Sequence, residues 1–305
     1  MADRVVGREL FVGIDGGATK TIARVENAQG QLLGVGKAGP ANIRLDPVGA
    51  WRSIRAAIAQ ALAEFAIPSE VAGYRWYGGA GLAGTQVPAA CDRFLALGHR
   101  FTRLHLHSDG YISCLGAHRG QDGAVIAIGT GVVAYQIEGE RVTRVSGWGF
   151  PQGDEGSGAW LGLAAIQHTL QWWDGRRAVT PLIRGVMARF DQDGDRLILW
   201  ANGAGSQQFA ELAPVVITAA AAGDESAIAL MTAAGQEIEK IWRALVAKQQ
   251  QPLPCSLLGG LASSLEPYLG DEMRSHLVPP QADAATGAVL LARQENLGAT
   301  GSAND

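Results

Sequence analysis

Two short glycine-rich turns in this chain carry residues that could bind phosphate. In the first, Asp15 ends the apolar run LFVGID and is followed by Gly16, Gly17, Thr19 and Lys20. A carboxylate at a strand end beside such a turn can hold a hydrated magnesium ion. Thr19 and Lys20 could then meet phosphate oxygens. A plain hairpin turn is the alternative, because Asp-Gly is a strong hairpin signal.

The second turn contains Gly129, Thr130 and Gly131 and follows the apolar run AVIAI. Each turn lies in a strand–turn–strand–turn–strand segment, at residues 10–38 and 124–147. One such turn alone is a weak signal, but two facing turns could clamp a triphosphate with their backbone N–H groups. The repetition therefore predicts a nucleotide held between two domains of one design.

Two further segments place carboxylates at a strand end or in a glycine-rich loop. Asp109 follows Ser108 after the run LHLH, so it either caps the next helix or acts as a base at the carboxyl end of a strand. Trp148 and Asp154 lie in the loop GWGFPQGDEGSG. This combination suits sugar recognition, since carboxylates accept hydroxyl hydrogen bonds and an indole can cover an apolar sugar face. The alternative is that the acids cap a helix starting near Ser157.

A strand, a double glycine and a helix are predicted at LLGGLASS, which contains Gly259, Gly260 and Ser263. Glycines there would let a flat ring lie against the backbone, and a tight turn is the alternative.

Other patterns in the sequence do not meet the requirements of the binding motifs that they resemble. Residues 34–39 match the dinucleotide fingerprint, but Pro40 follows where a helix is required. The aspartates at 191, 193 and 195 lack the spacing of a calcium loop, and we read the scattered histidines as core or surface residues.

The first half of the chain alternates strands and helices in a way that can position the first turn and Asp109. After the segment at 10–38, a helix is predicted to about residue 65, capped by Asp46 with Pro47 in its first turn. A strand at 74–81, a helix at 88–97, a strand at 103–109 and a helix at 110–119 follow. This order predicts a ribonuclease H-like lobe, with a mostly parallel sheet flanked by helices.

The second half repeats the plan with a helical insertion. We expect a helix at 159–173, a polar irregular stretch at 174–205, and helices at 207–222 and 224–249, the latter capped by Asp224. A strand at 255–260, a helix at 261–268, a strand near 276–280 and a last helix at 282–295 complete the chain. The predicted lobes are residues 1–112 and 113–282, and the last helix, about 283–295, could pack back on the first lobe.

Composition limits the classes of function. The chain has 305 residues, a net charge of −4 and no basic patch, so a nucleic-acid partner is not expected. No apolar stretch reaches the ~18 residues of a membrane span. The first ten residues include Asp3 and Arg4 and do not predict a signal peptide. The three cysteines form no CxxC pair, which fits a cytoplasmic protein, and the tail at 297–305 is predicted to be disordered.

Taken together, the motifs IDGGATKT, SDGYISCLGAHRGQDGAVIAIGTG, GDEGSG and LLGGLASSL resemble those of N-acetylglucosamine kinases and bacterial glucosamine kinases. Within the superfamily of sugar kinases, actin and heat-shock chaperones, the chain resembles the BadF/BadG/BcrA/BcrD-type ATPases over roughly residues 10–293. The resemblance implies two ribonuclease H-like lobes with an interlobe cleft that close around MgATP and a hexosamine. It also implies a homodimer.

The resemblance implies a role for each motif. Asp15 would position Mg²⁺ through water, and Asp109 would be the catalytic base on the sugar 6-hydroxyl. The phosphates of ATP would lie along Gly16, Gly17, Thr19, Lys20, Gly129, Thr130 and Gly131. The adenosine would lie against Gly259, Gly260 and Ser263. The sugar would contact Asn42, Trp148 and Asp154, with Gly81 to Gly84 in the pocket wall.

The expected reaction is ATP-dependent phosphorylation of N-acetylglucosamine at its 6-hydroxyl, with glucosamine as the second choice of substrate. Val132 and Val133 depart from the pattern, because many relatives have a small polar residue after the second turn. Two other classes stay open. One is an ATP-driven activase of a partner reductase or dehydratase, although cluster-ligating cysteines would be needed and Cys91, Cys114 and Cys255 are expected to be buried. The other is an ATP-gated module that has lost catalysis.

Overall fold

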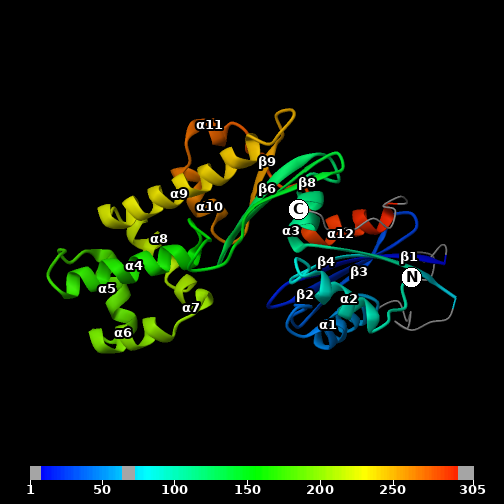
Figure 1. The fold of residues 1–305 in the computed structure, drawn as a ribbon, viewed down its shortest axis with the longest axis horizontal. Coiled ribbons are helices and arrows are strands. Elements are labelled where there is room, and N and C mark those ends of the chain that lie inside the picture. The colour runs from blue at the N-terminus through cyan, green and yellow to red at the C-terminus, as the bar shows by residue number, and fades with distance from the viewer. Residues whose placement is uncertain (1–7, 64–72, 295–305) are drawn as a thin grey trace. The chain divides into compact units, whose positions relative to one another are not determined.

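The chain folds into two compact units. The structure, a computed structural model, describes residues 8–63 and 73–294. Unit 1 comprises residues 1–122 and 280–305, and unit 2 comprises residues 123–279. Each unit contains one β-sheet and several helices (Figure 1). The last residues of the helix predicted to reach 65, the chain start with Asp3 and Arg4, and the tail predicted to be disordered lie outside the described residues.

The sheet of unit 1 contains the predicted three-stranded meander and two further strands, in the order β3-β2-β1-β4-β5. Its strands are β1 (Glu9–Gly16), β2 (Thr21–Asn27), β3 (Leu32–Ala38), β4 (Arg75–Leu82) and β5 (Arg103–His107). The first three strands form an antiparallel meander, whereas β1, β4 and β5 run parallel. The carboxyl ends of these three parallel strands therefore meet at one edge of the sheet.

Four helices accompany this sheet: α1 (Pro47–Ala61), α2 (Pro88–Ala96), α3 (Asp109–Ala117) and α12 (Ala284–Arg293). The predicted cap of α1 is confirmed, because an Asp46 carboxylate oxygen accepts a hydrogen bond from the Gly49 N–H at 2.8 Å. The boundary predicted after residue 112 falls inside α3, which belongs entirely to unit 1.

The last helix, α12, packs on β1, β4 and α3, although it begins about 200 residues after the end of β4 in sequence. Glycines on the strands allow this close approach. A Cβ built on Gly13 would lie 2.1 Å from the carbonyl oxygen of Ala285, and one on Gly79 would lie 2.0 Å from that of Ala288. Arg293 at the end of α12 also forms an ion pair with Glu26 on β2, at 3.0 Å. Unit 1 is thus built from both ends of the chain.

The sheet of unit 2 repeats the first four positions of this order as β8-β7-β6-β9. Its strands are β6 (Gly123–Ile128), β7 (Val132–Glu138), β8 (Arg141–Ser146) and β9 (Cys255–Leu258). The strand predicted near 276–280 is wrong: this segment makes only an isolated bridge between Leu277 and Cys255. Pro279 and Pro280 follow immediately, and proline has no N–H to extend a ladder.

The predicted long helices of unit 2 are present as α4 (Gly158–Trp173) and α9 (Glu225–Val246). The Asp224 cap of α9 is confirmed by hydrogen bonds from the N–H groups of Ser226 and Ala227. The helix predicted at 207–222 is divided into α7 (Ser206–Ala210) and α8 (Ala213–Ala221). Pro214 in the first turn of α8 cannot continue a preceding helix.

The stretch at 174–205 is not irregular as predicted. It contains α5 (Pro181–Met187), η3 (Ala188–Phe190) and α6 (Gly194–Gly203), and Thr180 and Asp193 cap the two α-helices. Asp, Asn and Thr residues occur in this stretch and favour loops as well as helix caps, so the sequence does not distinguish short capped helices from a loop. The chain of unit 2 closes with the short elements α10 (Ala262–Leu265), η4 (Glu266–Tyr268) and α11 (Asp271–Arg274).

Within residues 8–63 and 73–294, no single helix is long and apolar enough to cross a bilayer. The two helical segments 206–221 and 225–246, which meet at a bend of 117°, reach that length and apolar character only when taken together.

We predict that Gly79→Ala lowers the free energy of unfolding by about 1–3 kcal/mol, because the new Cβ would overlap the α12 backbone. Gly203→Ala is the matched control, since a Cβ at this exposed glycine meets no atom within 4 Å. Urea unfolding of both variants measures the difference. Equal stability of the two variants would contradict the close packing of α12 on β4.

Candidate functional site

The parallel strands of unit 1 bring Asp15 and Asp109 to the same edge of the sheet. Asp15 near the end of β1 lies opposite Gly81 of β4, and Gly81 lies opposite His107, the last residue of β5. Asp109 begins α3 two residues after this strand. Polar groups at the carboxyl ends of neighbouring parallel strands are a common form of ligand site.

Asp15 lies in an unfavourable environment for a negative charge. The pKa of its carboxyl is raised from 3.8 to about 6, chiefly by burial and then by the nearby Asp109 and Asp283 carboxylates, while Lys20 acts to lower it. A cation at this position would stabilise the charged form of Asp15. This edge of the sheet is therefore suited to bind a cation.

Magnesium is compatible with these residues. Among the described residues, no group of three His, Cys, Asp or Glu side chains is close enough to hold a metal ion alone. Magnesium usually keeps several waters and takes only one or two carboxylates together with substrate phosphates. Asp15, with Asp109 nearby, offers this kind of oxygen donor.

The first glycine turn is closed by backbone hydrogen bonds. The Gly17 N–H donates to the Lys20 carbonyl at 2.9 Å, and the Gly17 carbonyl accepts from Ala41 at 3.0 Å. A Cβ on Gly16 would overlap Leu82 and Ala41. The hairpin interpretation is thus correct for the backbone. The side chains of Thr19 and Lys20 are exposed, so they remain accessible to a ligand.

Asp109 is not the cap of α3. Ser108 is the N-cap, and its hydroxyl accepts a hydrogen bond from the Tyr111 N–H at 3.2 Å. Asp109 occupies the first helical position, where its carboxylate accepts only from the adjacent Gly110 N–H among the hydrogen bonds described for this side chain. Since Ser108 does the capping, the half-buried Asp109 carboxylate is left for other chemistry.

His107 supports this turn, and the sequence reading assigned it no function. Its Nδ1 accepts a hydrogen bond from the Ser108 N–H at 3.0 Å, and its ring stacks on Tyr111 with 3.6 Å between centroids. Burial lowers the pKa of His107 to about 4, so the ring is neutral near pH 7 and can accept this bond. His107 thereby fixes the backbone that presents Asp109.

Asn42 and Gly81 lie close to this edge. Asn42 pairs with Ala83 in an isolated bridge, and its side-chain oxygen accepts from the N–H groups of Arg44 and Leu45. The amide NH₂ of Asn42 makes no further bond that the structure describes. A Cβ on Gly81 would lie 2.3 Å from Ile112 of α3, so this glycine allows α3 to start against β4.

Asp283 is a second residue that the sequence reading missed. It caps α12 by accepting a hydrogen bond from the Thr286 N–H at 2.8 Å, and its charge raises the pKa of Asp15. The sequence signals a helix cap at Asp283 but gives no sign that the helix returns to β1.

In unit 2, the Gly129–Gly131 turn is bound to the start of α4. The carbonyls of Gly129 and Thr130 accept from the N–H groups of Gly158 and Ala159, at 2.8 and 3.1 Å. Ser157 caps α4 through a bond from the Trp160 N–H. The alternative in which the acids of the loop cap this helix is therefore wrong.

Asp154 is buried against the same turn. A Cβ on Gly131 would lie 2.4 Å from Oδ2 of Asp154. The backbone φ of Asp154 is 63°. Burial raises the pKa of the Asp154 carboxyl, whereas the N–H groups of Val132 and Gly149 favour its charged form. Asp154 thus joins the glycine-rich loop to the start of β7.

The double glycine after β9 reaches the same edge of the unit 2 sheet. Gly259 has a φ of 92°. A Cβ on Gly259 would lie 2.3 Å from the carbonyl oxygen of Ile128, the residue that precedes Gly129 in the chain. That carbonyl accepts from the Leu261 N–H at 3.1 Å. Gly259 is therefore next to the second glycine turn, and Gly260 and Ser263 continue from it.

Trp148 is a strongly exposed side chain in the glycine-rich loop. Its accessible fraction is 79%, and the Arg144 guanidinium lies 5.2 Å from the centre of its ring. Such exposure of an indole within a folded loop leaves an apolar face available to a ligand.

Comparison with known proteins gives the family of this chain. The BadF/BadG/BcrA/BcrD ATPase family matches residues 12–292. The chain belongs to this family. The sequence-based resemblance is thereby confirmed, and ATP use follows from the family.

Relatives of this ATPase include proteins named for amino sugars. Glucosamine kinase GspK of Vibrio cholerae serotype O1 is 36% identical over 92% of this chain and 95% of its own. An N-acetylmuramic acid/N-acetylglucosamine kinase of Clostridium acetobutylicum is 27% identical over 94% and 99%. The crystal structure of a candidate N-acetylglucosamine kinase from Chromobacterium violaceum has 36% identity and a TM-score of 0.86, covering 93% and 99%. The predicted fold class, with two ribonuclease H-like units, is confirmed.

Asp15 and His107 should contribute oppositely to the pH dependence of stability. Because folding raises the pKa of Asp15 from 3.8 to about 6, its contribution is fully present below pH 3.8 and is lost as pH rises through 6. Because folding lowers the pKa of His107 from 6.5 to about 4, its contribution is present above pH 6.5 and is lost as pH falls through 4.

We therefore predict that Asp15→Asn increases the free energy of unfolding, relative to the parent, more at pH 7 than at pH 4, by about 1–3 kcal/mol. His107→Gln should instead lower the free energy of unfolding, relative to the parent, more at pH 7 than at pH 4. This variant removes a stabilising contribution that is present only at the higher pH. Urea unfolding at both pH values measures the two differences. If both variants changed the free energy of unfolding in the same direction between pH 4 and pH 7, the pKa shift assigned to Asp15 or to His107 would be contradicted.

Proposed function

We propose that this chain is an ATP-dependent amino-sugar kinase that transfers the γ-phosphoryl group to the 6-hydroxyl of a hexosamine. N-acetylglucosamine and glucosamine are the two candidate substrates. The relatives support this class, because those at 36% and 27% identity are named for glucosamine and for N-acetylmuramic acid and N-acetylglucosamine. These two sugars differ in the substituent on the nitrogen, and the ADP-release assay described below distinguishes between them.

One observation carries the proposal: Asp15 and Asp109 approach each other closely enough to interact electrostatically at the carboxyl edge of the unit 1 sheet. Phosphoryl transfer needs a cation at the phosphates and a group that orients the attacking hydroxyl. In this proposal Asp15 would hold the magnesium of MgATP through water. Asp109 would accept the proton of the hydroxyl as the hydroxyl oxygen bonds to the γ-phosphorus, while the bond from the γ-phosphorus to ADP breaks and ADP leaves.

The glycine turns would bind the phosphates. In unit 1 these contacts would come from Gly16, Gly17, Thr19 and Lys20, of which Lys20 also brings a positive charge. In unit 2 they would come from Gly129, Thr130 and Gly131, which the start of α4 holds in place. Gly259, Gly260 and Ser263 would border the adenosine, because glycine leaves room for a flat base.

The sugar would contact Asn42, Gly81, Trp148 and Asp154. Asn42 can donate through its amide NH₂, since its side-chain oxygen is already bonded to the backbone. Trp148 can cover an apolar face of the ring, because its indole is exposed. Positioning and electrostatic stabilisation of this kind supply most of the acceleration in phosphoryl transfer.

The activase alternative is not favoured. Cys114 and Cys255 are buried, and burial raises the pKa of the Cys255 thiol to about 12. A thiol of this kind is a poor cluster ligand, since metals bind the thiolate. Cys91 is half-buried, more exposed than expected, and its thiol donates to the Thr85 carbonyl at 3.4 Å.

A coupled ADP-release assay with MgATP tests the proposal. The assay compares N-acetylglucosamine, glucosamine, N-acetylmannosamine, glucose and no sugar. We expect release that depends on one of the first two sugars. Release without sugar, or no release with any sugar, would contradict an amino-sugar kinase.

We predict that Asp109→Asn lowers kcat by about 10²–10⁴-fold while MgADP still binds, because an amide cannot accept the hydroxyl proton. Asp92→Asn is the matched control, since it removes a carboxylate from the exposed side of α2. Calorimetric titration of MgADP separates binding from turnover. Near-normal kcat in Asp109→Asn would remove Asp109 from the role of base.

A further inference from the structure

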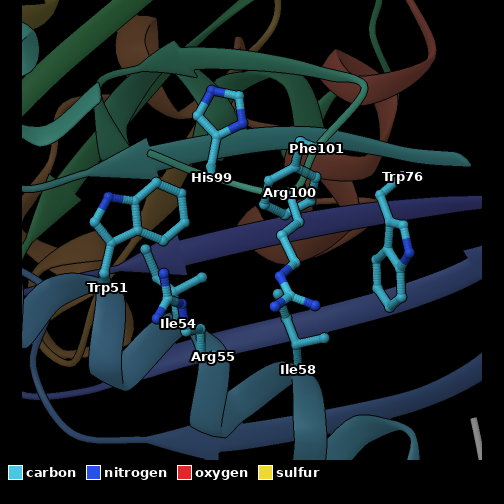
Figure 2. Close-up of a pocket in the computed structure, with 8 residues that line it drawn as sticks. All are labelled: Trp51, Ile54, Arg55, Ile58, Trp76, His99, Arg100 and Phe101. Carbon is cyan, nitrogen blue, oxygen red and sulfur yellow. The ribbon is translucent and has the colours of Figure 1, made fainter. Parts of the chain in front are cut away.

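A cavity of about 160 Å³ lies in unit 1 among α1, the start of β4 and the segment before β5 (Figure 2). Trp76, which lines it, is the second residue of β4, whereas Gly81 beside Asp15 is near the end of that strand. Five residues of parallel strand span roughly 17 Å. The cavity is therefore separate from the Asp15–Asp109 edge.

The walls of the cavity are apolar and fixed in place. Trp51, Ile54, Ile58 and Trp76 are all buried. The Trp51 ring stacks on Phe94 with 4.4 Å between centroids, and its Nε1 donates to the Phe94 carbonyl at 2.9 Å. Since these contacts hold the indole without any ligand, the apolar surface is preformed.

The rim of the cavity is positively charged. Arg55 and Arg100 contribute guanidinium groups, His99 contributes an imidazole, and none of the eight lining residues is acidic. The lining residues therefore carry positive and no negative side-chain charge, in a chain whose net charge is −4. In Figure 2 the Arg100 side chain extends between the two indoles, and the Arg55 side chain lies beside Ile54 near Trp51. A guanidinium there can bind a carboxylate through two parallel hydrogen bonds.

We infer that this cavity binds a small aromatic carboxylate, with one six-membered ring against Trp51 and Trp76 and the carboxylate at Arg55. The volume sets the number of rings, because a cavity of about 150 Å³ accommodates a single benzene. The positive charge of Arg55 at the rim favours a ligand with a negatively charged group at that end. This inference does not depend on the proposed kinase activity, since it concerns a different part of unit 1.

Calorimetric titration of the full chain with benzoate tests the inference, with benzyl alcohol and inorganic phosphate as comparison ligands. Benzyl alcohol keeps the ring without the charge, and phosphate keeps the charge without the ring. We expect benzoate to bind one saturable site and more tightly than either comparison. Equal binding of a comparison ligand, or no saturable benzoate binding in the millimolar range, would overturn the inference.

Two variants locate the binding. Arg55→Gln should weaken benzoate binding by about 10- to 100-fold, because it removes a charge-assisted hydrogen bond. Arg52→Gln is the matched control: it lies three residues earlier on α1, is also exposed, and does not line the cavity. Both changes are at exposed positions, so both variants should fold. Equal affinity of the two variants for benzoate would contradict the assignment to this cavity.

Discussion

The placement of two carboxylates at one edge of a parallel sheet is the constraint on which the rest of unit 1 depends. Asp15 and Asp109 repel each other, and burial makes the charge on Asp15 still less favourable. A fold keeps such an arrangement only if its surroundings determine it strongly. Here the parallel pairing of β1, β4 and β5 fixes Asp15, while Ser108 and His107 fix the turn that presents Asp109. A bound cation would relieve this unfavourable charge, because it would stabilise the ionised form of Asp15.

Glycine makes this arrangement possible by allowing helices to lie directly on strands. Gly81 lets α3 begin against β4, and Gly13 and Gly79 let α12 lie across β1 and β4. Because α12 comes from the far end of the chain, it brings a third carboxylate, Asp283, into the electrostatic environment of Asp15. In unit 2 the same device appears at Gly131, where a side chain would displace the Asp154 carboxylate. In both units, therefore, glycines without a side chain leave the space that a neighbouring segment and its carboxylate occupy.

Features set by neighbouring residues could be predicted from the sequence. The two meanders, the Asp46 and Asp224 caps and the strand–turn positions of Asp15 and Gly129 follow from local patterns, and the structure has them. Short helices within 174–205 were missed, because their capping residues resemble those of a loop. Ser108 and Asp109 are both good caps, so sequence alone could not assign the role. The influence of Asp283 on Asp15 and the cavity beside Trp76 arise from segments distant in sequence, for which one chain gives no signal.

The decisive measurement identifies which sugar oxygen receives the transferred phosphoryl group. After reaction of MgATP with glucosamine and with N-acetylglucosamine, ³¹P–¹H correlation spectroscopy of the product identifies the esterified oxygen. We expect a phosphate monoester coupled to the two protons on carbon 6 of one of these sugars, since Asp109 is proposed to act on that hydroxyl. A phosphate on the anomeric oxygen, or only inorganic phosphate, would contradict it.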